Sequence, residues 1–131
     1  MATTVLIAED EPHIREGLTF LISRAGHQVV TVSDGAAAVE QIIARRPDLV
    51  VLDIMIPELN GFEVMKRVRA TPGLEALPVL VLSAKGQEAD RQRMMALGAN
   101  QFVTKPFSNR DLMDRVNAMV SAGSAGVEPA P

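Results

Sequence analysis

Short, mainly apolar runs alternate along this chain with longer amphipathic stretches. The runs lie at residues 5–8, 29–32, 49–52, 79–82 and 102–103. The first, third and fourth contain no polar residue, which is typical of parallel strands that are covered on both faces. The five runs together predict a five-stranded parallel sheet.

The segments that join and follow these runs carry apolar residues at helical spacing. Ile14, Leu18 and Ile22, for example, fall on one face of a helix. The same spacing predicts four further helices, of which the fourth, around residues 87–97, has the weakest pattern. Strands that alternate with helices imply right-handed crossovers and an open, doubly wound α/β sheet. We expect one such domain over residues 1–122, and a flexible tail or linker at residues 123–131, where Gly, Ala and Pro accumulate.

Composition excludes several kinds of site. The chain has no Cys, which excludes disulfides, thiolate zinc sites and cysteine nucleophiles. His13 and His27 are its two histidines, so any bound metal is expected to be a hard cation held by oxygen. Aromatic residues make up 3% of the chain and the net charge is −3, and both values argue against direct binding of nucleic acid.

The N-terminal residues show no targeting signal. Residues 1–4 carry no basic run, and Glu9 and Asp10 interrupt the apolar stretch that follows. No window approaches the length of about 18 uninterrupted apolar residues that a membrane span needs. We therefore expect a soluble, cytoplasmic protein.

Polar residues follow or end the apolar runs that predict the strands. Glu9 and Asp10 follow the first strand, and Asp53 ends the third. Ser83 ends the fourth strand, and Lys105 follows the fifth. The carboxyl ends of the strands form the rim at which open α/β sheets bind ligands. If the strand order is the flavodoxin-like 2-1-3-4-5, the first and third strands are neighbours, and Asp10 and Asp53 lie in one cleft.

Three carboxylates in one cleft repel each other. At an effective dielectric constant of about 20, two like charges about 4 Å apart cost about 4 kcal/mol. A raised pKa on one carboxylate or a bound cation relieves this repulsion, and Mg²⁺ is the cation that oxygen ligands favour beside phosphate. Acidic metal ligands, a lysine and a hydroxyl are the groups that phosphoryl transfer requires. A carboxylate can itself accept the phosphoryl group.

Each of these residues also has a plainer interpretation. An acidic pair before a helix that starts with proline is often an N-terminal cap. A single Asp at a strand end is usually a turn residue, and Lys105 alone would be a solvated surface lysine. The functional interpretation gains its weight because several strand ends contribute polar residues to the same rim.

The order and spacing of these residues resemble those of response-regulator receiver domains. The resemblance covers about residues 4–121 and rests on Glu9-Asp10, the segment VVLDIMIP at 50–57, Asn60-Gly61, Leu82-Ser83-Ala84 and Lys105-Pro106-Phe107. One such motif is a weak signal, whereas the complete set is specific. The resemblance implies a flavodoxin-like (βα)5 domain with strand order 2-1-3-4-5.

The resemblance also implies a role for each matching residue. Asp53 would be the phosphoacceptor, and its phosphoryl donor would be a sensor histidine kinase or a histidine phosphotransfer protein. The metal site would hold Mg²⁺ through Glu9, Asp10, Asp53 and the backbone carbonyl of Met55. Ser83 and Lys105 would contact phosphoryl oxygens, and the Lys105–Pro106 peptide is expected to be cis.

The same resemblance predicts how a signal would leave the site. Ser83 would move toward the phosphoryl group, and the ring of Phe102 would take the space that it vacates. The surface made by the fourth helix, fifth strand and fifth helix would then contact a downstream output protein or domain, with the chain a monomer or a phosphorylation-dependent dimer. Phe102 stands where Tyr is common, and Glu9 stands where Asp is frequent, although the family also uses Glu.

Two other functions remain open at this stage. The first is an aspartate-nucleophile phosphatase of the haloacid-dehalogenase type, which carries a second Asp two residues after the nucleophile. Here that position is Met55. The second is a receiver-like scaffold that is not phosphorylated, which is expected to lack Asp53, the acidic pair or Lys105. The sequence favours a receiver that catalyses its own phosphorylation and dephosphorylation and is not an enzyme toward a separate substrate.

Overall fold

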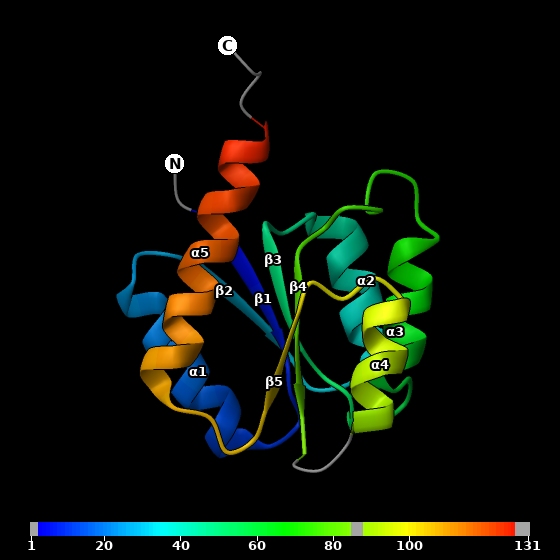
Figure 1. The fold of residues 1–131 in the computed structure, drawn as a ribbon, viewed down its shortest axis with the longest axis horizontal. Coiled ribbons are helices and arrows are strands. Elements are labelled where there is room, and N and C mark those ends of the chain that lie inside the picture. Colours follow the sequence, from blue (N-terminus) through cyan, green and yellow to red (C-terminus); the bar gives the residue numbers. More distant parts are fainter. Residues whose placement is uncertain (1–2, 85–87, 128–131) are drawn as a thin grey trace.

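The computed structural model describes the backbone of residues 3–84 and 88–127 and the side chains of residues 3–84 and 88–121. Within these residues five strands alternate with five helices, and the sheet lies between two layers of helices (Figure 1). The strands are β1 (Thr4–Ala8), β2 (Gln28–Val32), β3 (Leu49–Asp53), β4 (Val79–Ser83) and β5 (Gln101–Thr104). The helices are α1 (Pro12–Arg24), α2 (Gly35–Arg45), α3 (Gly61–Arg69), α4 (Glu88–Ala96) and α5 (Asn109–Val127).

The sheet has the order β2-β1-β3-β4-β5, and every neighbouring pair is parallel. This arrangement confirms the predicted flavodoxin-like α/β fold. In its register Ala8 pairs with Leu52, and Asp53 pairs with Leu82. The carboxyl ends of β1, β3 and β4 therefore finish at nearly the same level, at the lower end of the sheet in Figure 1.

Alternate residues of each central strand enter two separate cores. Val5 packs in a cluster that includes Leu18 of α1 and Leu112 of α5. Leu6 points to the other face and packs in a cluster that includes Met94 of α4. Because α1 and α5 cover one face of the sheet and α2, α3 and α4 cover the other (Figure 1), the central strands are apolar except at one end residue each, Thr4, Asp53 and Ser83.

Two elements are longer than their apolar pattern predicts. Strand β5 has four residues rather than the predicted two, Phe102 and Val103, because it also includes the polar residues Gln101 and Thr104. As β5 is an edge strand, Gln101 can be half-buried and Thr104 exposed. Helix α5 continues to Val127, past the boundary expected at residue 122. Once a helix has formed, each further residue adds a backbone hydrogen bond without a new nucleation cost. The division of the chain at residue 122 stays a prediction, and residues 128–131 lie outside the described residues.

Among the residues that the structure describes, none of the helices combines the length and the apolar character that a membrane crossing requires. The fourth helix begins at Glu88. Gln87, where the sequence pattern places its start, lies outside the described residues.

Candidate functional site

The strand ends bring the predicted polar residues to one rim. Asp53 is the last residue of β3, and Ser83 is the last residue of the neighbouring β4. Glu9 follows β1 directly and is tied to β2 by a hydrogen bond from its N–H to the Val32 carbonyl at 3.1 Å. Lys105 follows β5, and its N–H donates to the Ser83 carbonyl at 2.7 Å. Backbone hydrogen bonds therefore extend the sheet to the residues that carry the site.

Three carboxyl groups meet at this rim. One carboxylate oxygen from each of Glu9, Asp10 and Asp53 lies within 4.8 Å of the others. Glu9 and Asp53 are buried, at 0% and 4% exposure, whereas Asp10 is open to solvent. The cluster can therefore receive a ligand from the solvent side while the sheet fixes its inner wall.

Lys105 spans the two buried carboxyl groups. Its Nζ lies 2.7 Å from Oδ2 of Asp53 and 3.0 Å from Oε1 of Glu9. Burial by itself would lower the pKa of Lys105, but the hydrogen bonds to Asp53 and Glu9 raise it above its ordinary value. The lysine is therefore charged and balances part of the negative charge of the cluster.

The two buried carboxyl groups differ in their protonation. Burial, and after it the hydrogen bond with Asp53, raises the pKa of Glu9 to about 7. Burial also acts to raise the pKa of Asp53, but hydrogen bonds from Glu9, Lys105 and the Met55 N–H outweigh it and hold that pKa below its ordinary value. The two pKa shifts make Asp53 the more acidic member of the pair and Glu9 the member that takes up a proton more readily near neutral pH.

The acidic pair after β1 does not cap α1. The N-cap residue is Glu11, whose Oε2 accepts from the Ile14 N–H at 2.8 Å. That hydrogen bond is the main reason that the pKa of Glu11 is lowered. Glu11 was not among the predicted residues, although it stands directly before Pro12, which is typical of a first helical position. Because Glu11 is the N-cap residue of α1, the carboxyl groups of Glu9 and Asp10 are not needed as caps and lie in the cluster with Asp53.

The remaining predicted residues lie in the loop after Asp53, at the end of β4, and on and after β5. The Met55 N–H donates to Oδ1 of Asp53 at 3.0 Å, and the Met55 side chain is 71% exposed. Ser83 is 2% exposed, and its hydroxyl donates to the Ala84 carbonyl at 3.3 Å. Phe102 is half-buried and packs against the core cluster under α2, α3 and α4. The Lys105–Pro106 peptide is cis.

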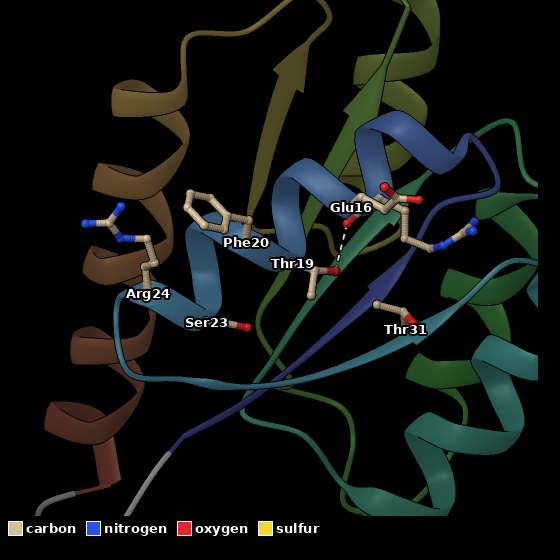
Figure 2. Close-up of a pocket in the computed structure, with 7 residues that line it drawn as sticks. Glu16, Thr19, Phe20, Ser23, Arg24 and Thr31 are labelled. Carbon is tan, nitrogen blue, oxygen red and sulfur yellow. Dashed lines mark hydrogen bonds between the residues drawn. The ribbon is translucent and has the colours of Figure 1, made fainter.

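Two of the hollows that border α1 differ in how they lie relative to the rim. One, of about 420 Å³, adjoins the end of β5 and is lined by Ile14, Ala84, Lys105, Pro106 and Phe107. The other, of about 670 Å³, lies between α1 and β2, where Phe20, Arg24 and Thr31 are among its lining residues (Figure 2). The second hollow includes none of the predicted site residues, so the chemistry at the rim does not extend into it.

Comparison with known proteins identifies the family. Residues 5–117 match the response regulator receiver domain family. The chain is a member of that family. It is 39% identical over 120 residues to the alkaline phosphatase synthesis transcriptional regulatory protein PhoP of Bacillus subtilis, a match that covers 92% of this chain and 49% of that protein. It is 38% identical over 120 residues to the phosphate regulon transcriptional regulatory protein PhoB of Escherichia coli, covering 92% and 52%. The receiver domain thus spans about half the length of these curated relatives.

Solved structures of receiver domains share the fold. The signal receiver domain of a signal transduction histidine kinase from Syntrophus aciditrophicus superposes with a TM-score of 0.86 at 31% identity, covering 99% of this chain and 96% of that one. The receiver domain of the sensor histidine kinase PA1611 from Pseudomonas aeruginosa superposes with a TM-score of 0.85 at 25% identity, covering 92% and 99%. That Pseudomonas structure has a magnesium ion coordinated in its active-site cleft.

Proposed function

We propose that this receiver domain is a phosphorylation switch in which Asp53 accepts a phosphoryl group from a sensor histidine kinase or a histidine phosphotransfer protein. The observation that carries the proposal is the buried carboxyl group of Asp53, 2.7 Å from the Lys105 ammonium and beside two further carboxyl groups. An Asp53 oxygen would form the new O–P bond as the N–P bond of phosphohistidine breaks. The departing imidazole nitrogen then takes up a proton, and Lys105 stands where it can neutralise phosphoryl charge.

The acidic cluster fits a divalent cation held by oxygen. Glu9, Asp10 and Asp53 offer three carboxylate oxygens in one group, and the backbone carbonyl of Met55 is the proposed fourth ligand. With all three carboxylates ionised, Lys105 offsets only part of their charge. Bound Mg²⁺ would supply positive charge for the phosphoryl oxygens.

The proposed response runs from Ser83 to Phe102. The Ser83 hydroxyl makes a long hydrogen bond to the Ala84 carbonyl, at 3.3 Å, which a phosphoryl oxygen would readily replace. Phe102 lies on β5 and is half-buried, so its ring can alter the surface made by α4, β5 and α5. We propose this surface as the contact for a downstream output protein or domain, or for a second phosphorylated copy.

The proposal excludes turnover of a separate substrate. An aspartate-nucleophile phosphatase needs a general acid two residues after the nucleophile, and the exposed thioether of Met55 cannot donate a proton. The reactions proposed for this chain are its own phosphorylation and dephosphorylation. The same proposal places the chain in the cytoplasm, where ATP supplies the phosphoryl groups of histidine kinases.

Phosphoryl labelling of an Asp53→Asn variant tests the proposed acceptor. Acetyl phosphate or a phosphohistidine donor should label the wild-type chain in the presence of Mg²⁺, and Asp53→Asn should abolish the labelling. Asp48→Asn is the matched control, because Asp48 accepts a hydrogen bond from the Thr4 N–H at 2.8 Å at the other end of the sheet. Undiminished labelling of a folded Asp53→Asn protein would overturn the assignment.

A further inference from the structure

The loop that follows Asp53 is anchored at its end and in its middle. At its end, the Gly61 N–H donates to the Ile54 carbonyl at 2.8 Å and closes residues 54–60 into a compact loop. In its middle, the Pro57 carbonyl accepts from the Gly35 N–H at 3.0 Å. Gly35 is the first residue of α2, so the second anchor comes from a different βα unit of the sheet.

The contact at Gly35 leaves no room for a side chain. A Cβ atom on Gly35 would lie 1.7 Å from the Leu59 carbonyl oxygen and 2.6 Å from the Leu59 carbonyl carbon. Both are backbone atoms, which cannot turn aside as the tip of a side chain can. Any larger residue at position 35 must therefore displace either the start of α2 or the loop.

The start of α2 is the better held of the two. Oδ1 of Asp34 accepts from the Ala37 N–H at 2.7 Å, which caps the helix. Ala38 in the first turn is 0% exposed and belongs to the core. The loop residues Pro57 and Glu58, by contrast, are exposed. A side chain at position 35 would therefore move the loop rather than the helix.

The loop backbone is strained between its two contacts with Gly35. Glu58 has a φ of +70°, a left-handed conformation that a residue with a side chain rarely adopts. Such a conformation persists where the surrounding structure over-determines it. Here the residue before Glu58 is hydrogen-bonded to Gly35, and the residue after it lies directly over Gly35. The two contacts with Gly35 thus hold the backbone on both sides of Glu58 in place.

We propose that Gly35 is a positioning residue for the phosphoacceptor site. The close contact at Gly35 fixes the path of residues 57–59, which lie two to four positions beyond Met55. Met55 in turn donates its N–H to Oδ1 of Asp53 at 3.0 Å. This inference rests on the proposed function, because the geometry that Gly35 maintains is that of the Met55 backbone and the Asp53 carboxylate toward Mg²⁺ and a phosphoryl group.

A pair of glycine substitutions tests this role. Gly35→Ala should weaken the binding of Mg²⁺, measured by calorimetry, by about 10- to 100-fold, which is the usual effect of losing a residue that supports metal ligands. It should weaken the Mg²⁺-dependent binding of beryllofluoride, a phosphoryl analogue, in the same direction. Gly17→Ala is the matched control, because nothing lies within 4 Å of a Cβ built on Gly17 of α1. The control should keep wild-type affinities, and circular dichroism of both variants reports whether they are folded.

Hydrogen exchange of the wild-type chain supplies a measurement that does not depend on how the variant folds. Binding of Mg²⁺ and beryllofluoride should slow exchange of the Gly35 amide by about threefold or more, because ligands that order the loop also secure the Pro57 carbonyl that accepts from it. The Gly26 amide, which donates to the Ser23 carbonyl at the opposite end of the sheet, should not change.

The outcomes separate this inference from the function on which it rests. If the wild-type chain binds neither Mg²⁺ nor beryllofluoride, the proposed function fails, and the positioning role fails with it. If the wild-type chain binds both, a folded Gly35→Ala protein with unchanged affinities would overturn the role of Gly35 alone. An unchanged exchange rate for the Gly35 amide would overturn it too.

Discussion

The ammonium nitrogen of Lys105 lies 2.7 Å from Oδ2 of Asp53, although the two residues are 52 positions apart in the chain. The same nitrogen contacts Glu9 at 3.0 Å. Two of the three carboxyl groups proposed as metal ligands are therefore already paired with a cation that belongs to the protein. We therefore expect Lys105 to compete with Mg²⁺ for the negative charge of these two carboxyl groups in the unphosphorylated state.

Lys105→Ala should therefore change metal binding and phosphoryl binding in opposite directions. Removing the ammonium group frees the oxygens of Glu9 and Asp53, so the dissociation constant for Mg²⁺ should fall by about tenfold, equivalent to about 1.4 kcal/mol. Binding of beryllofluoride at saturating Mg²⁺ should weaken, because the phosphoryl oxygens lose their lysine partner. Calorimetric titration of each ligand measures the two effects separately.

Lys66→Ala is the control for the lysine experiment. Lys66 also pairs with a carboxylate, Glu63 at 3.4 Å, but both side chains are exposed on α3. Its removal should leave both affinities unchanged. Weaker rather than tighter Mg²⁺ binding by Lys105→Ala would contradict the competition.

Asp10→Asn should weaken Mg²⁺ binding without destabilising the metal-free domain. Asp10 is the solvent-exposed member of the carboxylate cluster, and its charge opposes that of Glu9 and Asp53 until a cation is bound. The rise in melting temperature that Mg²⁺ causes by linkage should shrink, while the melting temperature without metal should hold or increase slightly. Glu16→Gln on the exposed face of α1 is the control. An unaltered Mg²⁺-dependent rise in Asp10→Asn would remove Asp10 from the metal site.

Mg²⁺ affinity should increase with pH between about 6 and 8, because the proton on Glu9 competes with the metal. The pKa of Glu9, about 7, lies above its value of 4.5 in an unfolded chain. Without metal, Glu9 therefore contributes stability that is complete below pH 4.5 and is lost as the pH rises through about 7. The lowered pKa of Asp53 acts in the opposite sense, but only in acid, below its ordinary value of 3.8.

Proton release measures this competition directly. Calorimetry in two buffers with different heats of ionisation should show that Mg²⁺ displaces about half a proton per ion near pH 7, where Glu9 is half-protonated. The release should approach zero by about pH 9. Glu9→Gln has no proton to lose at this position, so release that persists in that variant would assign the titration to another group.

The sequence predicted the sheet better than its edges. Strands β1, β3 and β4 are buried on both faces, so an unbroken apolar run is sufficient to locate them. Strand β5 has a neighbouring strand on one side only. Its first and last residues, Gln101 and Thr104, are polar, so the apolar run located only the two residues between them. The end of α5 was missed for a related reason, because hydrogen bonds along a helix need no apolar periodicity.

The sequence predicted that Asp53 and Glu9 lie close together. It did not predict the raised pKa of Glu9 or the contact of Gly35 with the loop after β3. A strand end fixes where Asp53 and Glu9 lie, since parallel strands finish at one edge. The raised pKa of Glu9 depends on complete burial and on Asp53, which only the folded arrangement supplies. The contact between Gly35 and Leu59 likewise joins the start of α2 to the loop after β3, and no motif links the two. Contacts between segments of different βα units carry little signal in a single sequence.

The last prediction concerns how the signal leaves the site through Ser83. This residue is buried at the end of β4, and its hydroxyl donates to the neighbouring Ala84 carbonyl at 3.3 Å. A phosphoryl group on Asp53 would offer a stronger acceptor, and a direct hydrogen bond to it would be about 3 Å long. The hydroxyl would have to move to make that bond.

The space that Ser83 vacates is what the ring of Phe102 would occupy. Packed interiors switch between discrete arrangements rather than deform continuously, so the ring should have an outward and an inward rotamer. Phe102 has no hydroxyl to anchor either state, so the packing around the ring must set the balance between them. Without the Ser83 hydroxyl, the site should still accept a phosphoryl group but should lose its connection to the ring.

Ser83→Ala should therefore bind beryllofluoride and accept phosphoryl groups, both more weakly or slowly than the wild type. The chemical-shift changes that beryllofluoride causes in α4 and α5 should largely disappear, while those of Asp53 and Met55 should remain. Ser23→Ala, at an exposed position on α1, is the matched control and should keep the full wild-type response. NMR spectra of each variant with and without beryllofluoride supply the comparison. A full response of α4 and α5 in Ser83→Ala would mean that the signal reaches these helices by a route that bypasses the β4 hydroxyl.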